Sequence, residues 1–499
     1  MRTPKVRACG IPFFGHRKQP AFTCEKKHTP HLCPTLRDMV CGYVPSSRLR
    51  APYPVLVRSE SSAHTSKGVI VLVKLGKQAR SVSIVGVGCT PFKNFEDHPQ
   101  TKGMSEGDAF GYAALEAIQD AGLEPRDIQY FYHGAANPFM IGDSLTPNMQ
   151  VADWFGVRGI GLVHHSEACC TGYVALQEAV QAVASGTYDV VLSGAVDLAA
   201  SLPVVDAPGC FRRDFPLSEM LPSIPKVYDR AYGRPFDSAF GISFDNWINK
   251  YRWEYDLSAE QIDDALNGVS KSLRRDAVLN PLAFSTKTFD ELAKENDLPD
   301  ADAYLKSFGN PKVTQYLRVT GFEIKCDGAA ALVVMPTDMA VARGLDHKVI
   351  DVLGTGAAAF EGATPDNEYN GTKAGAEQVY ELTGVSPDEL DLLFVNDFFL
   401  AGDIVAAEEV GYIPRGEAWQ YAIDGRMGFD GDKPINTHGG RCNFGHAHGA
   451  SGVADVVEAV KQMRGEAGAT QMPKVPQTTF LRGFGGGQNI RCQILRTHD

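Results

Sequence analysis

The sequence lacks any long hydrophobic run and any excess of positive charge. No stretch of about 18 or more apolar residues occurs in the 499-residue chain, so no segment is predicted to cross a membrane. The formal net charge of −12 argues against nucleic acid as a general partner. The hydrophobic content of 44% and charged content of 22% are ordinary for a globular protein, and the length suffices for more than one core.

Cysteine pairs with zinc-binding spacing are also missing. The chain has 11 cysteines, an odd number, and no secretory signal pattern, so we predict reduced thiols and a cytoplasmic location. Cysteines and histidines gather near the N-terminus: Cys9, Cys24, Cys33, Cys41, His16, His28 and His31. None of these cysteines forms the C-x2–4-C pair that is usual for zinc, so no metal site is predicted.

Acidic residues are scarce in the first 80 positions. Residues 1–80 hold 15 Lys and Arg against 3 Asp and Glu, which leaves 33 against 57 in the remainder. The segment is rich in Pro, Ser and Arg and has little periodicity, so we expect a basic, disordered N-terminal extension. A transit-like leader, which would make the protein mitochondrial, and upstream sequence included by a wrong start choice are the alternatives.

The remainder of the chain contains an internal repeat. The pattern TG-x5-EAV at 171–180 returns as SG-x5-EAV at 451–460, and GLEP at 122–125 returns as GVSP at 384–387. Strands and helices alternate in the same order around both copies, which predicts an α/β protein with two duplicated βαβ-type halves. Residues 81–200 and 322–344 form the first half, residues 345–499 the second, and residues 201–321 an inserted loop domain that shapes substrate access.

The two copies of the repeat begin with different reactive side chains. Cys169 opens the first copy at the predicted start of a helix, where unpaired N–H groups and the helix dipole favour a thiolate. His446, flanked by Gly445, stands ahead of the second copy. A cysteine that transfers an acyl group needs a nearby base and N–H donors, so the pair predicts nucleophilic catalysis.

Several separated motifs resemble those of thiolases, which make or break the C–C bond of 3-oxoacyl-CoA. The motifs are ACCTG at 168–172, NPLA at 280–283, DGAA at 327–330, NDFF at 396–399, GHAHGASG at 445–452 and the glycine loop GFGGG at 483–487. They cover about residues 82–495 in the family's order. The resemblance implies the thiolase fold, in which βαβαβαββ halves form a five-layered αβαβα core.

The resemblance also implies a role for each matching residue. Cys169 takes the acyl group as a thioester, and His446 activates Cys169 and helps to bind the thioester oxygen of the second substrate. Asn396 fixes a water that completes this oxyanion hole. The backbone N–H groups of Cys169 and Gly485 form the other hole. Coenzyme A is a substrate, and no permanently bound cofactor is expected.

The second cysteine that thiolases use as an acid and base is missing. Gly483 and Phe398 stand at the two places where the family carries it. Cys170, Cys442 and His448 are candidates to replace it, with His448 preferred. His133, at the end of an apolar strand, is predicted to be structural.

Ala447 stands where thiolases usually have proline, as in the two-component type that pairs with a small zinc-ribbon/OB-fold subunit, such as benzoylsuccinyl-CoA thiolase. We therefore expect a homodimer and such a companion subunit. A retro-aldol lyase on the same fold and a non-catalytic acyl-CoA-binding protein remain alternatives. Arg212, Arg213 and Lys226 are candidate contacts for the CoA phosphates. The acyl chain cannot be read from the sequence.

Overall fold

The computed structural model describes residues 78–136, 154, 159–200, 236–359, 371–485 and 489–498. All of them belong to one unit that spans Ile70–Asp499. The basic extension predicted for residues 1–80 lies outside the described residues except at its last three positions. Arg212, Arg213 and Lys226 lie outside them as well, so their assignment to CoA stays a prediction.

The first half contributes five strands in the order β3-β2-β4-β5-β1. They are β1 (Val82–Cys89), β2 (Tyr130–Gly134), β3 (Gly161–His165), β4 (Val191–Leu198) and β5 (Asp327–Pro336). β2 runs parallel to β3 and β4, whereas β5 is antiparallel to β4 and β1. β1, β4 and β5 are buried along their whole length, as expected for strands covered on both faces.

The second half repeats this pattern with four strands in the order β6-β9-β8-β7. They are β6 (Ile350–Ala359), β7 (Leu392–Val395), β8 (Thr478–Gly485) and β9 (Asn489–Thr497). β7 is parallel to β8, and β9 is antiparallel to β8 and β6. The halves meet where Ser83 and Ile84 of β1 pair with Asp351 and Ile350 of β6, so the described strands form one continuous sheet.

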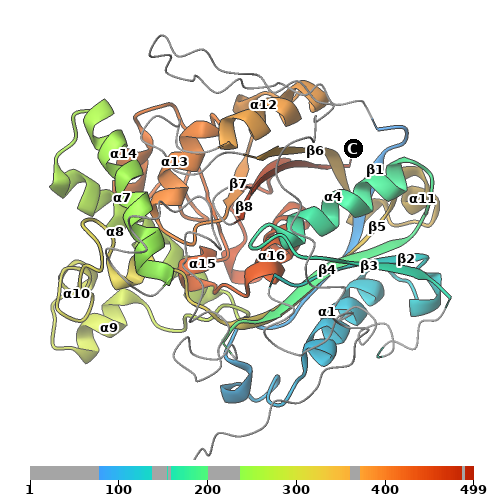
Figure 1. The fold of residues 1–499 in the computed structure, drawn as a ribbon, viewed down its shortest axis with the longest axis horizontal. Coiled ribbons are helices and arrows are strands. Elements are labelled where there is room, and N and C mark those ends of the chain that lie inside the picture. The colour runs from blue at the N-terminus through green and yellow to red at the C-terminus, as the bar shows by residue number, and fades with distance from the viewer. Residues whose placement is uncertain are drawn as a thin grey trace, which may run out of the picture. The chain divides into compact units, whose positions relative to one another are not determined.

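Helices separate and cover the two halves of the sheet (Figure 1). α4 (Thr171–Ala184) and α16 (His448–Arg464) pack against each other in the middle layer, where Val180, Val183 and Val457 share one hydrophobic cluster. α1 (Glu106–Asp120) and the short α11 (Thr337–Ala342) contact strands of the first half, and α12 (Thr372–Thr383) covers β6 and β9. These layers confirm the predicted αβαβα thiolase fold.

Helices of the insertion pack against the second half. The described ones are α7 (Phe236–Glu254), α8 (Ala259–Leu279), α9 (Phe289–Glu295) and α10 (Ala301–Leu305). α8 contacts α14 (Ala418–Ile423) and α15 (Gly440–Asn443), and α13 (Ala401–Glu409) packs next to α14. Phe244 and Trp247 of α7 share a hydrophobic cluster with Phe398 and Phe484. The described part of residues 201–321 is therefore fused to the core of the second half; the domain limits themselves stay a prediction.

One strand, β8, is not predicted from the sequence. The motif GFGGG at 483–487 is expected to be a loop, but β8 continues through Gly485, because Gly483 to Gly485 pair with Asn489 to Arg491 of β9. This ladder of backbone hydrogen bonds outweighs the low strand preference of glycine, although the pairing with β7 already ends at Arg482. Within the described residues, none of the helices combines the length and the apolar character that a membrane crossing requires.

Candidate active site

Cys169 lies in a tight turn between β3 and α4. The turn is closed by the N–H of Cys170, which donates to the carbonyl of Glu167 at 3.0 Å, and by the N–H of Thr171, which donates to that of Ala168 at 3.1 Å. Ala168 has a φ of 49°, a left-handed conformation that is strained for a residue with a side chain. The turn fixes the backbone of Cys169 ahead of the helix, with Cys170 as the N-cap.

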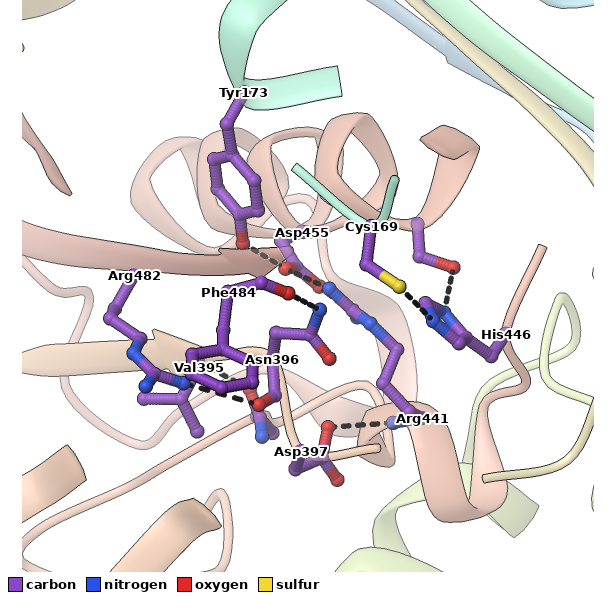
Figure 2. A network of polar contacts seen from close by, with 12 residues as sticks. Cys169, Tyr173, Val395, Asn396, Asp397, Arg441, His446, Asp455, Arg482 and Phe484 are labelled. Atoms are coloured by element: carbon purple, nitrogen blue, oxygen red, sulfur yellow. Dashed lines mark hydrogen bonds and ion pairs between the residues drawn. The ribbon is translucent and has the colours of Figure 1, made fainter. Parts of the chain in front are cut away.

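His446 comes from the other half of the chain and meets Cys169 directly. Its Nε2 lies 3.2 Å from Cys169 Sγ, and its Nδ1 lies 3.0 Å from Ser451 Oγ (Figure 2). The N–H of His446 donates to the carbonyl of Ile324 at 2.7 Å, which holds the backbone of the loop before α16. The structure thus brings together the cysteine and the histidine that open the two copies of the repeat.

Burial makes this pair neutral. Burial, together with the negative charge of Glu323, raises the pKa of the Cys169 thiol, so the thiol form is favoured in the resting protein. Burial, with His448 and Arg441 nearby, lowers the pKa of His446 well below its usual value. The expectation that the helix start holds Cys169 as a thiolate is therefore wrong, because desolvation outweighs the helix dipole and Cys169 precedes the N-cap.

Asn396 and Gly485 lie beside this pair, where the second half approaches the turn. The side-chain amide of Asn396 donates to the carbonyl of Phe484 at 2.7 Å, and its Oδ1 accepts from the N–H of Phe398 at 3.3 Å. A Cβ on Gly485 would lie 2.8 Å from the carbonyl oxygen of Glu167 and 2.9 Å from the nitrogen of Cys170. Only glycine permits this close approach of β8 to the turn that contains Cys169.

A buried ion pair lies beside the site. Arg441 donates to both carboxylate oxygens of Asp455, each at 2.6 Å, and Tyr173 of α4 donates to the same carboxylate (Figure 2). The N–H of Arg441 donates to Asp397 Oδ1 at 2.7 Å. Arg441 and Asp455 are 0% exposed, so the network joins α4, α15 and α16 without contact with water.

The ring of Tyr173 fills the place beside Gly483. A Cβ on Gly483 would lie 2.5 Å from Tyr173 Cδ2, and a Cβ on Gly452 would lie 2.7 Å from the same atom. No side chain therefore fits at Gly483 while Tyr173 keeps its position. Phe398, the other place discussed for a second cysteine, packs in an aromatic cluster with Phe484 and Phe244.

The two candidate cysteines point toward backbone carbonyls. The thiol of Cys170 donates to the carbonyl of Asn489 at 3.1 Å, and that of Cys442 donates to the carbonyl of Asp397 at 3.2 Å. Burial raises the pKa of Cys170 to about 12 and that of Cys442 well above its usual value. Both thiols are thus hydrogen-bonded to the backbone. His448, the third candidate, lies beside His446, with ring centroids 5.1 Å apart.

Sequence reasoning missed a carboxylate at this site. Glu323 Oε2 lies 3.2 Å from His446 Nε2, and the side chain is only 4% exposed. One donor atom each of Glu323, His446 and His448 lies within 4.8 Å of the other two, the one cluster among the described residues with the spacing of a cation site. A cation there would compete with Cys169 for His446 Nε2, so we interpret the cluster as a site for proton transfer.

The signal for Glu323 in the sequence is weak. The residue stands four positions ahead of the DGAA motif, in a segment with no recognisable pattern. Its backbone N–H donates to the carbonyl of Phe398 at 3.0 Å, and this long-range contact brings the carboxylate to the site.

His133 lies away from the nucleophile, in a cluster of histidines. Its Nδ1 is 3.0 Å from Nδ1 of His164 on β3, and its ring packs against Phe110 and Phe131. Burial, with His164 and His165 nearby, lowers the pKa of His133 to about 3. A neutral, buried ring in an aromatic setting agrees with the structural role predicted for it.

Family models match parts of both halves. Residues 361–495 match "Thiolase C-terminal domain-like", and residues 133–207 match "Beta-ketoacyl synthase, N-terminal domain". Among curated proteins, the chain is 28% identical to an acetyl-CoA acetyltransferase of Methanothermobacter thermautotrophicus, over 82% of this chain and 97% of the relative. It is 25% identical to benzoylsuccinyl-CoA thiolase subunit BbsB of Thauera aromatica, over 83% of this chain and 97% of the relative.

Solved structures show the same fold. The structure titled "Ltp2-ChsH2(DUF35) aldolase" matches with a TM-score of 0.64 at 22% identity, over 84% of this chain and 98% of the other. Human mitochondrial 3-ketoacyl-CoA thiolase matches with a TM-score of 0.59 at 16% identity, over 85% of this chain and 100% of the other. At these identities the likeness concerns the fold alone.

Proposed function

We propose that this chain, which is similar to thiolases, is a CoA-dependent C-acyltransferase that cleaves or forms the C–C bond of a 3-oxoacyl-CoA. The observation that carries the proposal is the 3.2 Å contact between Cys169 Sγ and His446 Nε2, two residues from opposite halves of the chain. The relatives named acetyl-CoA acetyltransferase and benzoylsuccinyl-CoA thiolase support the same class of reaction.

In the cleavage direction, Cys169 attacks the 3-oxo carbon of the substrate while its proton passes to His446 Nε2. A neutral pair suits this step, because the thiol loses its proton only as the new C–S bond forms. Ser451 holds the imidazole through Nδ1 and, as a hydroxyl, accommodates either tautomer. The C–C bond then breaks, which leaves an acyl thioester on Cys169 and the enolate of the shorter acyl-CoA.

Two oxyanions form during this sequence, and each needs fixed donors. We assign the backbone N–H groups of Cys169 and Gly485 to the oxygen of the acyl-enzyme, because β8 approaches the nucleophile turn so closely. We assign His446 and a water held by Asn396 to the thioester oxygen of the second substrate. One N–H of the Asn396 side-chain amide donates to the carbonyl of Phe484, and we assign its second N–H to this water.

Steady-state kinetics with substituted nucleophiles tests the proposal. We expect Cys169→Ala to abolish CoA-dependent cleavage of 3-oxoacyl-CoA, and His446→Asn to lower its rate by about a hundredfold or more. Cys442→Ala, which removes a neighbouring thiol, serves as the matched control for cysteine loss. Full cleavage activity in Cys169→Ala would instead support the retro-aldol lyase, and acylation of Cys169 without C–C turnover the non-catalytic acyl-CoA-binding protein.

We also propose that the chain acts as a homodimer with a small zinc-ribbon/OB-fold companion. One relative is itself named a subunit, and one similar structure carries a title with two protein names. Co-expression with a zinc-ribbon protein encoded beside it should yield a stable complex of two copies of each. Full activity of the isolated chain would contradict the need for a companion.

A further inference from the structure

The site contains a buried carboxylate that the mechanism above does not use. Glu323 Oε2 and Cys169 Sγ each lie 3.2 Å from the same atom, His446 Nε2. The carboxylate therefore lies within two hydrogen-bond lengths of the nucleophilic sulfur. The imidazole nitrogen has one bonding position, so a proton on it can face the sulfur or the carboxylate oxygen, but not both at once. His446 Nε2 is therefore placed to take a proton from Cys169 and then to pass it to Glu323.

From this arrangement we propose that Glu323 is the acid and base that moves the proton at the α-carbon of the substrate. The inference rests on the proposed C-acyltransferase function and names a residue that this function still needs. Gly483 has no room for a side chain beside Tyr173, and Phe398 has no titratable group. Cys170 and Cys442 donate to backbone carbonyls. Glu323 is the carboxylate in contact with the reacting pair.

The surrounding backbone holds Glu323 in place. The N–H of Glu323 donates to the carbonyl of Phe398, and the next residue, Ile324, forms backbone hydrogen bonds with Arg441 and His446. Its N–H donates to the carbonyl of Arg441 at 3.0 Å, and its carbonyl accepts from the N–H of His446 at 2.7 Å. The carboxylate and the imidazole are therefore carried by hydrogen-bonded neighbouring segments, which fixes their distance.

The protons balance with Glu323 in this role. In the cleavage direction the thiol proton of Cys169 passes to His446 Nε2 and from there to the Glu323 carboxylate, while the sulfur bonds to the 3-oxo carbon. The Cα–Cβ bond breaks, and the carboxylic acid of Glu323 gives its proton to the enolate α-carbon. When CoA attacks the acyl thioester, its thiol proton passes to His446 Nε2 and from there to the departing sulfur of Cys169. Glu323 ends as the carboxylate with which it began.

His448 is the competing candidate, and its position suits it less. It is the first residue of α16, where unpaired N–H groups and the helix dipole disfavour an imidazolium. An acid and base at the α-carbon must hold a proton in one step and release it in the other. A carboxylate that faces the shared imidazole nitrogen can do both.

Exchange of the α-hydrogens of acetyl-CoA in deuterated water isolates this step from thioester formation. We expect Glu323→Gln to lower α-exchange and C–C cleavage about a thousandfold, while acylation of Cys169 by acetyl-CoA changes no more than about threefold. Glu323→Asp should recover part of the exchange. Glu458→Gln, which alters a buried glutamate of α16 bonded to Gln462 and Thr470, serves as the control, and thermal melting checks each variant.

Wild-type exchange rates in Glu323→Gln would overturn the assignment, and loss of exchange in His448→Asn alone would transfer the role to His448. Loss of both exchange and acylation in a folded Glu323→Gln would reduce Glu323 to a positioning residue for His446. Absence of acylation in the wild type would contradict the proposed function, and the role of Glu323 with it.

Discussion

At the scale of single residues, the reactivity of the site depends on how burial changes the pKa of the Cys169 thiol. A cysteine at a helix start is usually associated with a lowered pKa, but Cys169 precedes the N-cap and lies beside Glu323. Its pKa is raised by loss of water and by that charge, so the reactive thiolate arises only as the proton leaves for His446. The chemistry therefore depends on a contact between two side chains rather than on the helix dipole.

This difference is measurable by alkylation. We expect the rate of Cys169 carbamidomethylation by iodoacetamide to rise about tenfold per pH unit through pH 9, because the thiol keeps its proton over this range. Glu323→Gln should increase the rate at a given pH, since a negative charge next to the sulfur is removed. Peptide mass spectrometry separates Cys169 from Cys170. A plateau below pH 8 would show a thiolate at rest and contradict the account.

Gly483 provides a second test at this scale. A Cβ at this position would lie 2.5 Å from the ring of Tyr173, so Gly483→Ala should lower the free energy of unfolding by about 1–3 kcal/mol through overpacking. The matched control is Gly107→Ala in α1, where the nearest atom to a new Cβ is 3.8 Å away. Chemical denaturation measures both. Equal stability of the two variants would show that Tyr173 does not occupy the space.

At the scale of elements, the two halves are tied together by helices that meet in the middle layer. Tyr173 of α4 and Arg441 of α15 both bind Asp455 of α16. Because Cys169 precedes α4 and His446 precedes α16, this contact fixes the elements on which the two reactive groups stand. The geometry of the site is thus a consequence of the packing of two repeated helices.

Removing the negative charge of Asp455 should therefore destabilise the folded chain. Asp455→Asn leaves Arg441 buried without its counter-ion, and we expect it to lower the free energy of unfolding by about 3–5 kcal/mol. Asp264→Asn, which breaks a surface pair with Lys306, should change it by less than about 1 kcal/mol. Urea denaturation of both variants gives the comparison. A small effect of Asp455→Asn would mean that the pair does not hold the helices.

The buried histidines of β2 and β3 should lower the stability of the folded chain at acidic pH. His133 has a pKa of about 3 in the folded chain against about 6.5 when unfolded, so the unfolded chain binds the proton first. The stabilisation is complete above about pH 6.5 and is lost as the pH falls toward 3.

Between pH 7 and pH 5, His133 should account for a loss of up to about 2 kcal/mol. His133→Phe, which keeps a ring against Phe110, should lessen this loss by that amount in urea titrations at the two pH values. An equal loss in variant and wild type would place the acid sensitivity elsewhere.

At the scale of the whole molecule, the sequence predicts most of the architecture because the chain repeats itself. The paired TG-x5-EAV and SG-x5-EAV patterns locate α4 and α16, and their shared order places Cys169 opposite His446. The local sequence pattern is enough to locate both residues, since each stands just ahead of a recognisable helix. The glycines of β8 have the local pattern of a loop, and only their pairing with β9 makes them part of a strand.

Glu323 and Tyr173 could not be found in this way. Each acts through a contact with a distant segment: Glu323 with His446, and Tyr173 with Gly483 and Asp455. No spacing in the sequence records such contacts. The raised pKa of Cys169 has the same origin, because burial is a property of the folded molecule and not of a motif.

The most direct test of the central claim is mass spectrometry of the intact protein and its peptides after incubation with a panel of acyl-CoAs and 3-oxoacyl-CoAs. The account predicts one acyl adduct, located on Cys169, that forms with the wild type, disappears when CoA is added and is absent from Cys169→Ala. The chains that form the adduct would also define the substrate class. Turnover of a 3-oxoacyl-CoA without an adduct on Cys169, or an adduct on another residue that CoA discharges, would contradict it.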